Sequence, residues 1–210
     1  MKTVGFLAQK GGAGKTTLAV HLAVLAGAPL LDLDPQQSAS DWARARSSDQ
    51  PPVIPVKPVD LSSILDAVRD TGVGWTFVDT PPHAQSTVAA VPRFCDLIVI
   101  PTRPSIMDLR ALGKTFDIVR ASSTPAVIVL NACPAPRLLG EARPVREARA
   151  VLESSGIPIA PCTITDRADM QHALIDGRSV TEFDPNSKAA AEIGALWSYL
   201  KGVVSRGKAS

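Results

Sequence analysis

The sequence has few cysteines and no strong net charge, and both shortages exclude broad classes of protein. Its three cysteines, Cys95, Cys133 and Cys162, lie far apart and form no C-x-x-C pair. This pattern argues against a disulfide framework and against a zinc site, and it fits a reducing cytoplasm. Lysine and arginine number 22 against 20 aspartates and glutamates, a formal charge of +2. No overall field points to nucleic acid, so any DNA binding must come from a local patch.

Long apolar runs are also missing. The longest, residues 18–31, is broken by His21 and Pro29 and falls short of the ~20 residues that a membrane span needs. A predicted strand starts almost at the first residue, so we expect neither a signal peptide nor a transmembrane helix. With 45% hydrophobic residues, the chain can form one α/β domain with a substantial core. We expect this domain over residues 1–204 and a flexible tail over 205–210.

A glycine-rich stretch lies between an apolar run and an amphipathic one. Residues 9–17 read Gln-Lys-Gly-Gly-Ala-Gly-Lys-Thr-Thr. A glycine loop between a strand and a helix N-terminus lets backbone N–H groups converge on a phosphate. Lys15 can then reach the β- and γ-phosphates, and the Thr16 hydroxyl can ligate Mg²⁺. The predicted nucleotide contacts of this loop are Gly11, Gly12, Ala13, Gly14, Lys15, Thr16 and Thr17.

Carboxylates follow two short apolar runs. Asp32 and Asp34 end the run that begins at Pro29, and because one residue separates them they point to the same side of the strand. Asp79 ends the apolar run 75–79 and is followed by a Pro-rich segment, the pattern of a Walker B strand. A solvated turn is the alternative interpretation of the Asp32–Asp34 pair.

The remaining pattern alternates strands and helices. Further strands are predicted at 53–56, 96–102, 126–131 and 157–162, the first at an edge because of its proline. Further helices are predicted from Ser38 or Ser40 and at 60–70, 104–121, 141–154, 165–177 and 189–204. This alternation predicts an α/β fold with a doubly wound, mostly parallel sheet flanked by helices. The nucleotide would bind at the carboxyl ends of the strands, as in P-loop NTPases.

The glycine loop departs from the common pattern G-x-x-x-x-G-K-[ST], because Gln9 stands where its first glycine should be. Instead it follows K-G-G-x-G-K-[ST], with a second lysine, Lys10, at its entrance. On this motif the chain resembles the ParA/MinD family of deviant Walker A ATPases, and especially its short plasmid-partition members. The resemblance implies ATP and Mg²⁺ as cofactors and an ATP-dependent homodimer in which Lys10 reaches the partner's nucleotide. A phosphate contact within the same subunit and a solvated charge are the other interpretations of Lys10.

The resemblance also implies roles for the carboxylates. Asp34 would position or activate the attacking water, Asp32 would support the Mg²⁺ shell, and Asp79 would hold Mg²⁺ through a water. The implied catalytic set is Lys10, Lys15 and Asp34, and the implied metal set is Thr16, Asp32 and Asp79. Residues 80–85, which include His83, resemble the family's second switch, and 104–108 resemble a segment at its dimer interface. The segment from Thr17 to Asp32 looks about one helical turn shorter than is usual in the family.

Asn131 follows a predicted strand at the place where P-loop proteins read the base. The run Asn-Ala-Cys-Pro over 131–134 is not the N-K-x-D that bonds guanine, so ATP is favoured over GTP. In the family an asparagine here can bond adenine, and a loop cap is the other interpretation.

Arginines at spacings of three on the predicted helix 141–154 are candidates for DNA contacts. With one from the next helix, the set is Arg143, Arg146, Arg149 and Arg167. Glutamates interleave with them, so a merely solvated face is the alternative. Residues 165–185 resemble the C-terminal third of small partition ATPases, which supplies adenine-contacting loops and basic residues that meet DNA phosphates. Phosphate contacts of this kind are independent of sequence and sensitive to salt.

The function implied by the resemblance is that of a ParA-type partition or positioning ATPase. Its ATP-bound dimer would bind non-specific DNA and segregate a plasmid or another cargo, and slow hydrolysis would release it. A ParB-like or centromere-binding adaptor would stimulate hydrolysis, and the protein would be cytoplasmic and associated with the nucleoid. One alternative is a MinD-like ATPase that binds a membrane through the apolar face of helix 189–204. The others are an iron–sulfur carrier using Cys95 and Cys133, and a metabolic P-loop enzyme.

Overall fold

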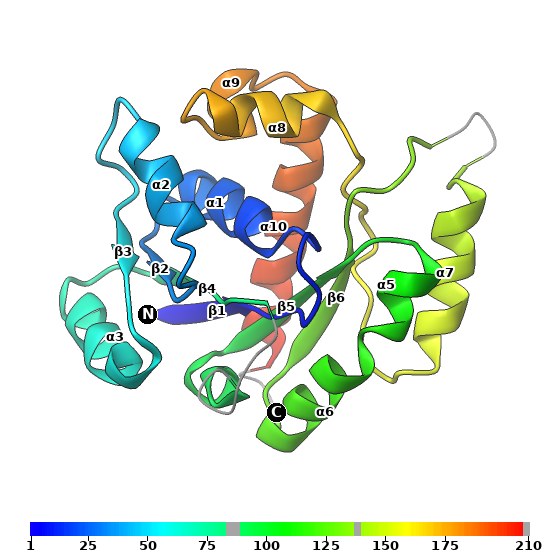
Figure 1. Ribbon diagram of the computed structural model, residues 1–210, viewed down its shortest axis with the longest axis horizontal. Coiled ribbons are helices and arrows are strands. Elements are labelled where there is room, and N and C mark those ends of the chain that lie inside the picture. Colours follow the sequence, from blue (N-terminus) through cyan, green and yellow to red (C-terminus); the bar gives the residue numbers. More distant parts are fainter. Residues whose placement is uncertain (83–88, 137–139, 208–210) are drawn as a thin grey trace.

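The computed structural model describes residues 1–82, 89–136 and 140–207, and its centre is a six-stranded sheet. The strand order is β3-β2-β4-β1-β5-β6, and every neighbouring pair is parallel (Figure 1). The strands are β1 (Lys2–Phe6), β2 (Leu30–Asp32), β3 (Val53–Pro55), β4 (Trp75–Asp79), β5 (Leu97–Thr102) and β6 (Ala126–Leu130). The predicted doubly wound α/β fold is confirmed.

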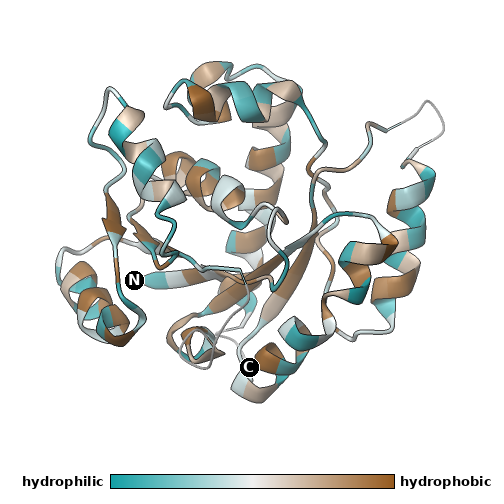
Figure 2. Cartoon of the chain, in the orientation of Figure 1, coloured by the Kyte–Doolittle hydropathy of each residue, from teal (hydrophilic) through white to brown (hydrophobic). Residues whose placement is uncertain are grey.

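Helices cover both faces of the sheet and bury a separate apolar cluster on each. One face carries α1 (Lys15–Ala26), α2 (Ser38–Ala45), α8 (Ala168–Ile175), α9 (Val180–Phe183) and α10 (Lys188–Arg206). The other carries α3 (Leu61–Asp70), α5 (Ile106–Arg110), α6 (Gly113–Ser122) and α7 (Arg143–Glu153). Two short 3₁₀ turns, η1 (Pro58–Asp60) and η2 (Val91–Phe94), lie in the connections. Figure 2 shows the strands mostly apolar and the polar helix faces turned outward.

The strands are apolar where both faces of the sheet are covered. Every residue of β5 and of β6, which lies at one edge of the sheet, is buried, and this explains their continuous apolar runs. β3 forms the opposite edge, as predicted, and its Pro55 is exposed. An edge strand tolerates a proline because one side of it has no neighbour to bond.

The glycines at 14 and 27 predict a helix from about Lys15 to Ala26, and helix α1 has these bounds. Gly27 follows it with a φ of 58°, and its N–H bonds the carbonyls of Ala23 and Val24. Because β2 begins at Leu30, residues 27–29 alone join the helix to that strand. This tight connection accommodates the short segment before Asp32.

Two of the predicted elements are not continuous in the structure. Residues 157–162 are not a strand but make one isolated bridge, in which Ile159 pairs with Ile128 of β6. Pro158 and Pro161 carry no N–H, so a longer ladder cannot form there. The helix predicted over 104–121 is two helices, broken just before Gly113, a residue of low helix propensity.

The last helix is longer than predicted and its apolar face is occupied. It runs to Arg206, which takes it into the stretch predicted as a flexible tail. Its apolar residues pack against the sheet and are buried; they are Ile193, Leu196, Trp197 and Leu200. In the described residues no helix is long and apolar enough to cross a membrane.

Candidate nucleotide-binding site

The loop between β1 and α1 has the conformation that its glycines permit. Gly12 and Gly14 take φ values of 75° and 97°, a region that favours glycine. A Cβ on Gly12 would meet nothing within 4 Å, whereas one on Gly14 would lie 1.9 Å from Asn131 Nδ2. The loop therefore leaves open space in front of Gly12 and is packed tightly behind Gly14.

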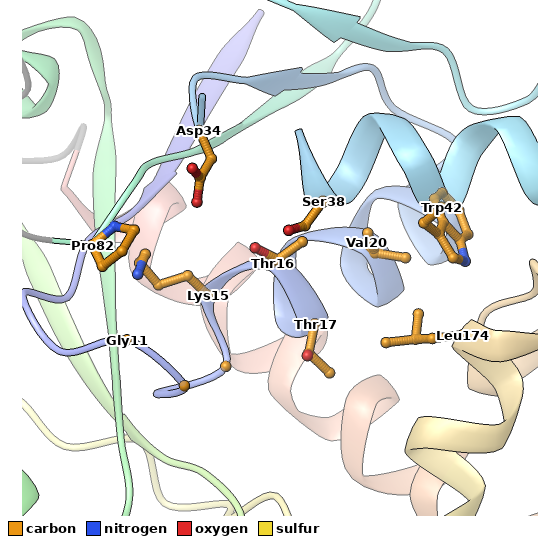
Figure 3. A pocket seen from close by; sticks show the side chains of 12 residues that line it. Gly11, Lys15, Thr16, Thr17, Val20, Asp34, Ser38, Trp42, Pro82 and Leu174 are labelled. Carbon is orange, nitrogen blue, oxygen red and sulfur yellow. The ribbon is translucent and has the colours of Figure 1, made fainter. Parts of the chain in front are cut away.

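A cavity of about 390 Å³ opens beside this loop. We call it the phosphate cavity. Figure 3 shows Lys15, Thr16, Asp34 and Ser38 around it, with Trp42 and Leu174 at its far end. Burial lowers the pKa of Lys15, while the carboxylates of Asp79 and Asp34 act in the opposite direction. A buried ammonium group in a glycine cradle fits the charge of a nucleotide's phosphates.

Thr16 and Asp79 meet at the floor of the site. The Thr16 hydroxyl donates to Asp79 Oδ2 at 2.5 Å, and Asp79 is fully buried at the end of β4. Burial raises the pKa of Asp79 to about 7, although the Thr16 hydrogen bond and Lys15 oppose the shift. Its Oδ1 has no hydrogen-bond partner among the described residues. A hydroxyl beside an unpaired carboxylate oxygen is a donor set that suits Mg²⁺, so Thr16 and Asp79 fit the predicted metal.

Asp32 organises the chain around the site. It lies beside Asp79 in the register of β2 with β4. Its Oδ2 accepts from the backbone N–H and the hydroxyl of Ser40, at 2.9 and 2.7 Å, and its Oδ1 accepts from the Asp34 N–H. These contacts fix the turn from β2 into α2. The metal-supporting role of Asp32 stays a prediction.

Asp34, the predicted catalytic carboxylate, lines the phosphate cavity. Its side chain points into the phosphate cavity and is partly exposed there. Its Oδ1 accepts from the Gln36 N–H at 2.9 Å, which orients the carboxylate. The arrangement suits a carboxylate that holds a water beside a phosphate.

Lys10 does not lie in the phosphate cavity. Its Nζ is 2.9 Å from Asp108 Oδ1, and 43% of its side chain is exposed. Asp108 lies in α5, within the segment predicted to form a dimer interface. The ammonium group is therefore held against α5 by a nearly buried carboxylate, away from the phosphate cavity.

Asn131 supports the loop. Its Nδ2 donates to the Ala13 carbonyl at 2.8 Å, so its Oδ1 is the atom left for another partner. A second cavity, of about 220 Å³, lies on this side of the loop and includes Gly12, Thr17, Asn131, Arg167 and Gln171. We call it the nucleoside cavity. It adjoins the phosphate cavity through the glycine loop, as the two halves of a nucleotide require.

The predicted DNA-contacting arginines are in different situations. Arg149 bonds Glu141 and the carbonyls of Ala160 and Pro161, and Arg167 bonds Glu192. Arg143 is 82% exposed and pairs with Glu147, and Arg146 is exposed with no ion pair in the described part of the chain. Arg149 and Arg167 thus hold the fold together, whereas Arg143 and Arg146 face outward.

Part of the predicted second switch is described. Thr80 donates to the Phe6 carbonyl at 2.6 Å, which ties the end of β4 to β1. Residues 83–85, including His83, lie outside the described residues. Pro82 lines the phosphate cavity.

Sequence reasoning missed several residues of the site. Trp42 and Leu174 line the phosphate cavity and Arg103 lines the nucleoside cavity. Trp42 and Leu174 carry no motif and are brought together by packing between α2 and α8. Arg103 could have been predicted from the sequence as a site residue, because it directly follows β5 at the edge of the sheet where ligands bind.

The fold and site define a P-loop nucleotide-binding protein with a candidate metal-ligand pair and a candidate catalytic carboxylate. Residues 4–180 match the family model described as the CobQ/CobB/MinD/ParA nucleotide binding domain. The chain belongs to this family, and it is a ParA/MinD-type ATPase whose cofactors are ATP and Mg²⁺.

Known proteins of this family resemble the chain over most of its length. The chain is 34% identical over 203 residues to the maintenance of carboxysome distribution protein A of Gloeobacter kilaueensis, covering 91% of this chain and 89% of that protein. Among solved structures it resembles an aspartate-to-alanine variant of Cyanothece McdA in complex with ATP. That match has a TM-score of 0.69 and 18% identity over 93% of this chain and 96% of that one. It also resembles the Pyrococcus horikoshii septum site-determining protein MinD with Mg-ADP, with a TM-score of 0.75 and 15% identity over 97% and 98% of the chains.

Proposed function

We propose that this protein is a positioning ATPase whose ATP-bound form is a homodimer that binds non-specific DNA and distributes a large cargo. The observation that carries the proposal is the place of Lys10. Its side chain is 43% exposed and pairs with Asp108 of α5, outside the phosphate cavity that Lys15 already serves. A second lysine there can reach a nucleotide held by another subunit.

The chain's own residues account for slow hydrolysis. Lys15 and the glycine loop bind and orient the phosphates, Thr16 and Asp79 hold the metal, and Asp34 positions the water that attacks. Bound Mg²⁺ neutralises phosphate charge. Because one partly exposed carboxylate positions the water, turnover by the chain alone should be slow, and an adaptor that completes the site would raise it.

The Asn131 amide supports the choice of ATP. Its Nδ2 donates to the Ala13 carbonyl, which leaves Oδ1 as an acceptor, and Asn131 lines the nucleoside cavity. That acceptor can bond the exocyclic amine of adenine, whereas the carbonyl at the same ring position of guanine offers it no hydrogen. We therefore propose that Asn131 both supports the loop and selects adenine.

For the cargo, we favour a large protein assembly over a plasmid. The relative that is 34% identical is named for carboxysome distribution, and it matches along nearly its whole length. In this proposal the cargo carries an adaptor that stimulates hydrolysis, and the ATP-bound protein lies on the nucleoid in the cytoplasm. A plasmid with a centromere-binding adaptor is the second candidate cargo, because the loop motif is shared with partition proteins.

Two alternatives have less support. The apolar face of α10 is buried against the sheet and would have to leave the core to bind a membrane. Cys95 packs against Gly5 of β1, where a Cβ would lie 2.8 Å from its sulfur, and burial raises the pKa of its thiol far above the usual range. Such a thiol is a poor cluster ligand.

The proposal is tested by binding to random-sequence duplex DNA with ATP, with ADP and without nucleotide, at two salt concentrations. Wild type should bind only with ATP and more weakly at high salt, since the contacts are to phosphates. Lys10→Ala should retain ATP and lose both dimer and DNA binding. Arg44→Ala is the matched control, because it also removes one exposed positive charge, that of an arginine on α2 that pairs with Asp41. Absence of DNA binding in every state would overturn the proposal, and liposomes would be tested next.

A further inference from the structure

Arg46 lies at the C-terminal end of α2 and contacts a part of the chain that is remote in sequence. Its guanidinium bonds both carboxylate oxygens of Glu182, at 2.8 and 3.0 Å, and the Gly177 carbonyl at 3.1 Å. A further bond of 2.6 Å joins it to the Gln50 carbonyl. Only 3% of the Arg46 side chain is exposed. This buried fork joins α2 to the turn between α8 and α9.

The contact is close as well as charged. Gly177 has a φ of 66°, and a Cβ there would lie 2.5 Å from the Ala45 carbonyl oxygen, so the backbones of the two segments touch. Glu182 is also held by the Ser179 N–H at 2.7 Å, in a capping box at the start of α9. Hydrogen bonds from Arg46 hold the pKa of Glu182 below its ordinary value, so the carboxylate is charged and the ion pair is complete.

Both ends of the fork belong to elements that form the nucleotide site. α2 starts at Ser38, four residues after Asp34, and it places Ser38 and Trp42 on the phosphate cavity. Across from it, α8 places Leu174 on the same cavity and Gln171 on the nucleoside cavity. The Arg46 fork therefore joins the two walls of one cavity.

Other contacts make each wall rigid, so that the fork sets their separation. Asp32 fixes the first turn of α2 through Ser40, and the Val180 N–H of α9 donates to His21 Nδ1 of α1 at 3.1 Å. The Arg46 guanidinium also lies 4.6 Å from the centre of the Trp42 ring. Because Trp42 also lines the phosphate cavity, a displacement of Arg46 would change the surroundings of this ring.

We propose that Arg46 is a positioning residue for ATP hydrolysis, which joins α2 to the α8–α9 turn and so holds Asp34 at its place over the phosphate cavity. It contacts neither the loop nor Lys15, so it acts on the catalytic step more than on nucleotide binding. The inference rests on the ATPase activity of the family and on the role proposed for Asp34. It is independent of DNA and cargo.

The first test is Arg46→Lys, which keeps the charge and loses the planar fork. We expect kcat for ATP hydrolysis to fall about tenfold, as misplacing a catalytic group does, while KM changes less than threefold. Glu182→Gln keeps the shape of the partner and should lower kcat in the same direction. Arg178→Ala is the matched control, because it removes an ion pair and a ring contact in the same turn without touching α2. Its kcat should stay within twofold of wild type.

A fluorescence measurement separates positioning from simple loss of structure. The nucleotide-dependent change in emission that disappears in Trp42→Phe reports on α2, and it should shrink in Arg46→Lys but persist in Arg178→Ala. An unchanged kcat and an unchanged Trp42 signal in a folded Arg46→Lys would overturn the proposal. So would a kcat that falls only in proportion to the folded fraction, or a rise in KM alone. Absence of DNA binding by the wild type would count against the proposed function and leave this result standing.

Discussion

Lys10 and Asp108 form an ion pair that keeps the second lysine of the loop on its own subunit, with 2.9 Å between Nζ and Oδ1. Burial works against ionisation of Asp108, but hydrogen bonds from Ser105 and Lys10 outweigh it and hold the pKa of the carboxyl below its ordinary value. If Lys10 serves a second subunit, as proposed, this pair must break when the dimer forms. The monomer and the dimer then compete for one ammonium group.

Asp108→Ala should therefore favour the dimer. An ion pair with a half-exposed lysine is worth about 0.5–1 kcal/mol, and a symmetric dimer breaks two of them, so ATP-dependent dimerisation should strengthen roughly 5- to 30-fold. Sedimentation velocity with a slowly hydrolysed ATP analogue measures it. Asp66→Ala, which removes an exposed ion pair on α3, is the control and should change nothing. A weaker dimer in Asp108→Ala would show that Asp108 itself supports the interface.

Asp34→Ala should trap the ATP-bound state. Removing the carboxylate takes away the group that positions the water, and Lys15, Thr16 and the glycine loop still hold the nucleotide. ATP turnover should fall by about 100-fold or more, with ATP affinity within a few-fold of wild type. Rapid-quench turnover and equilibrium ATP binding measure the two quantities. Rapid hydrolysis by this variant would refute the catalytic role.

Gly14→Ala should damage the loop by two separable effects, backbone strain and a clash. Gly72→Ala supplies the strain alone, because Gly72 also has a positive φ but an added Cβ there meets nothing within 4 Å. That control should cost about 1–2 kcal/mol. Gly14→Ala should cost clearly more in chemical denaturation, and the excess should disappear when Asn131→Ala is added. An additive double variant would mean that Asn131 is not the obstacle.

His21 predicts an acid-sensitive core. It is fully buried, and burial lowers its pKa from 6.5 to about 4. As the pH falls from 6.5 to about 4, His21 takes up a proton in the unfolded chain but not in the folded one, so the free energy of unfolding declines over this pH range. The loss reaches about 3 kcal/mol at pH 4. His21→Asn can still accept from the Val180 N–H, and its unfolding free energy should change less between pH 7 and pH 4. Parallel pH profiles for the two proteins would contradict this account.

The arginines of α7 should divide by their surroundings. Arg146→Ala removes an exposed charge that bonds nothing described, so it should weaken DNA binding at every sequence and reduce the salt slope by about 1. Arg149→Ala breaks bonds to Glu141 and two carbonyls, so it should lower the melting temperature instead. The measurements are DNA titrations at several salt concentrations and thermal unfolding. Equal DNA affinity of Arg146→Ala and wild type would move the DNA surface elsewhere.

The elements that sequence predicts well are those where one local pattern decides the structure. The bounds of α1, the strand that ends at Asp79, and the edge position of Pro55 all follow from glycine, apolar runs and proline. The strand predicted over residues 157–162 is wrong. Their apolar pattern suits a strand, but the prolines among them lack the N–H groups that a ladder needs. A count of apolar residues does not register that loss.

Contacts between segments that are far apart in the sequence cannot be predicted from such local patterns. The motif placed Lys15, Thr16 and Asp79 in one site, and the structure brings them together. The motif did not predict that Arg46 bonds Glu182 or that the Asn131 amide packs on Gly14. Such pairs depend on how helices pack across the sheet, which no short pattern encodes. The Lys10–Asp108 pair could be predicted in part, because both residues belong to segments that resemble parts of a dimer interface.

The bond between Thr16 and Asp79 joins the two side chains that would hold the metal. A cation that is to contact both side chains must first break this bond. Free Mg²⁺ brings no phosphate to offset this cost, whereas the magnesium–nucleotide complex brings the charge that Lys15 and the loop attract. The order of assembly follows: magnesium should enter the site together with the nucleotide, and free magnesium alone should bind it weakly.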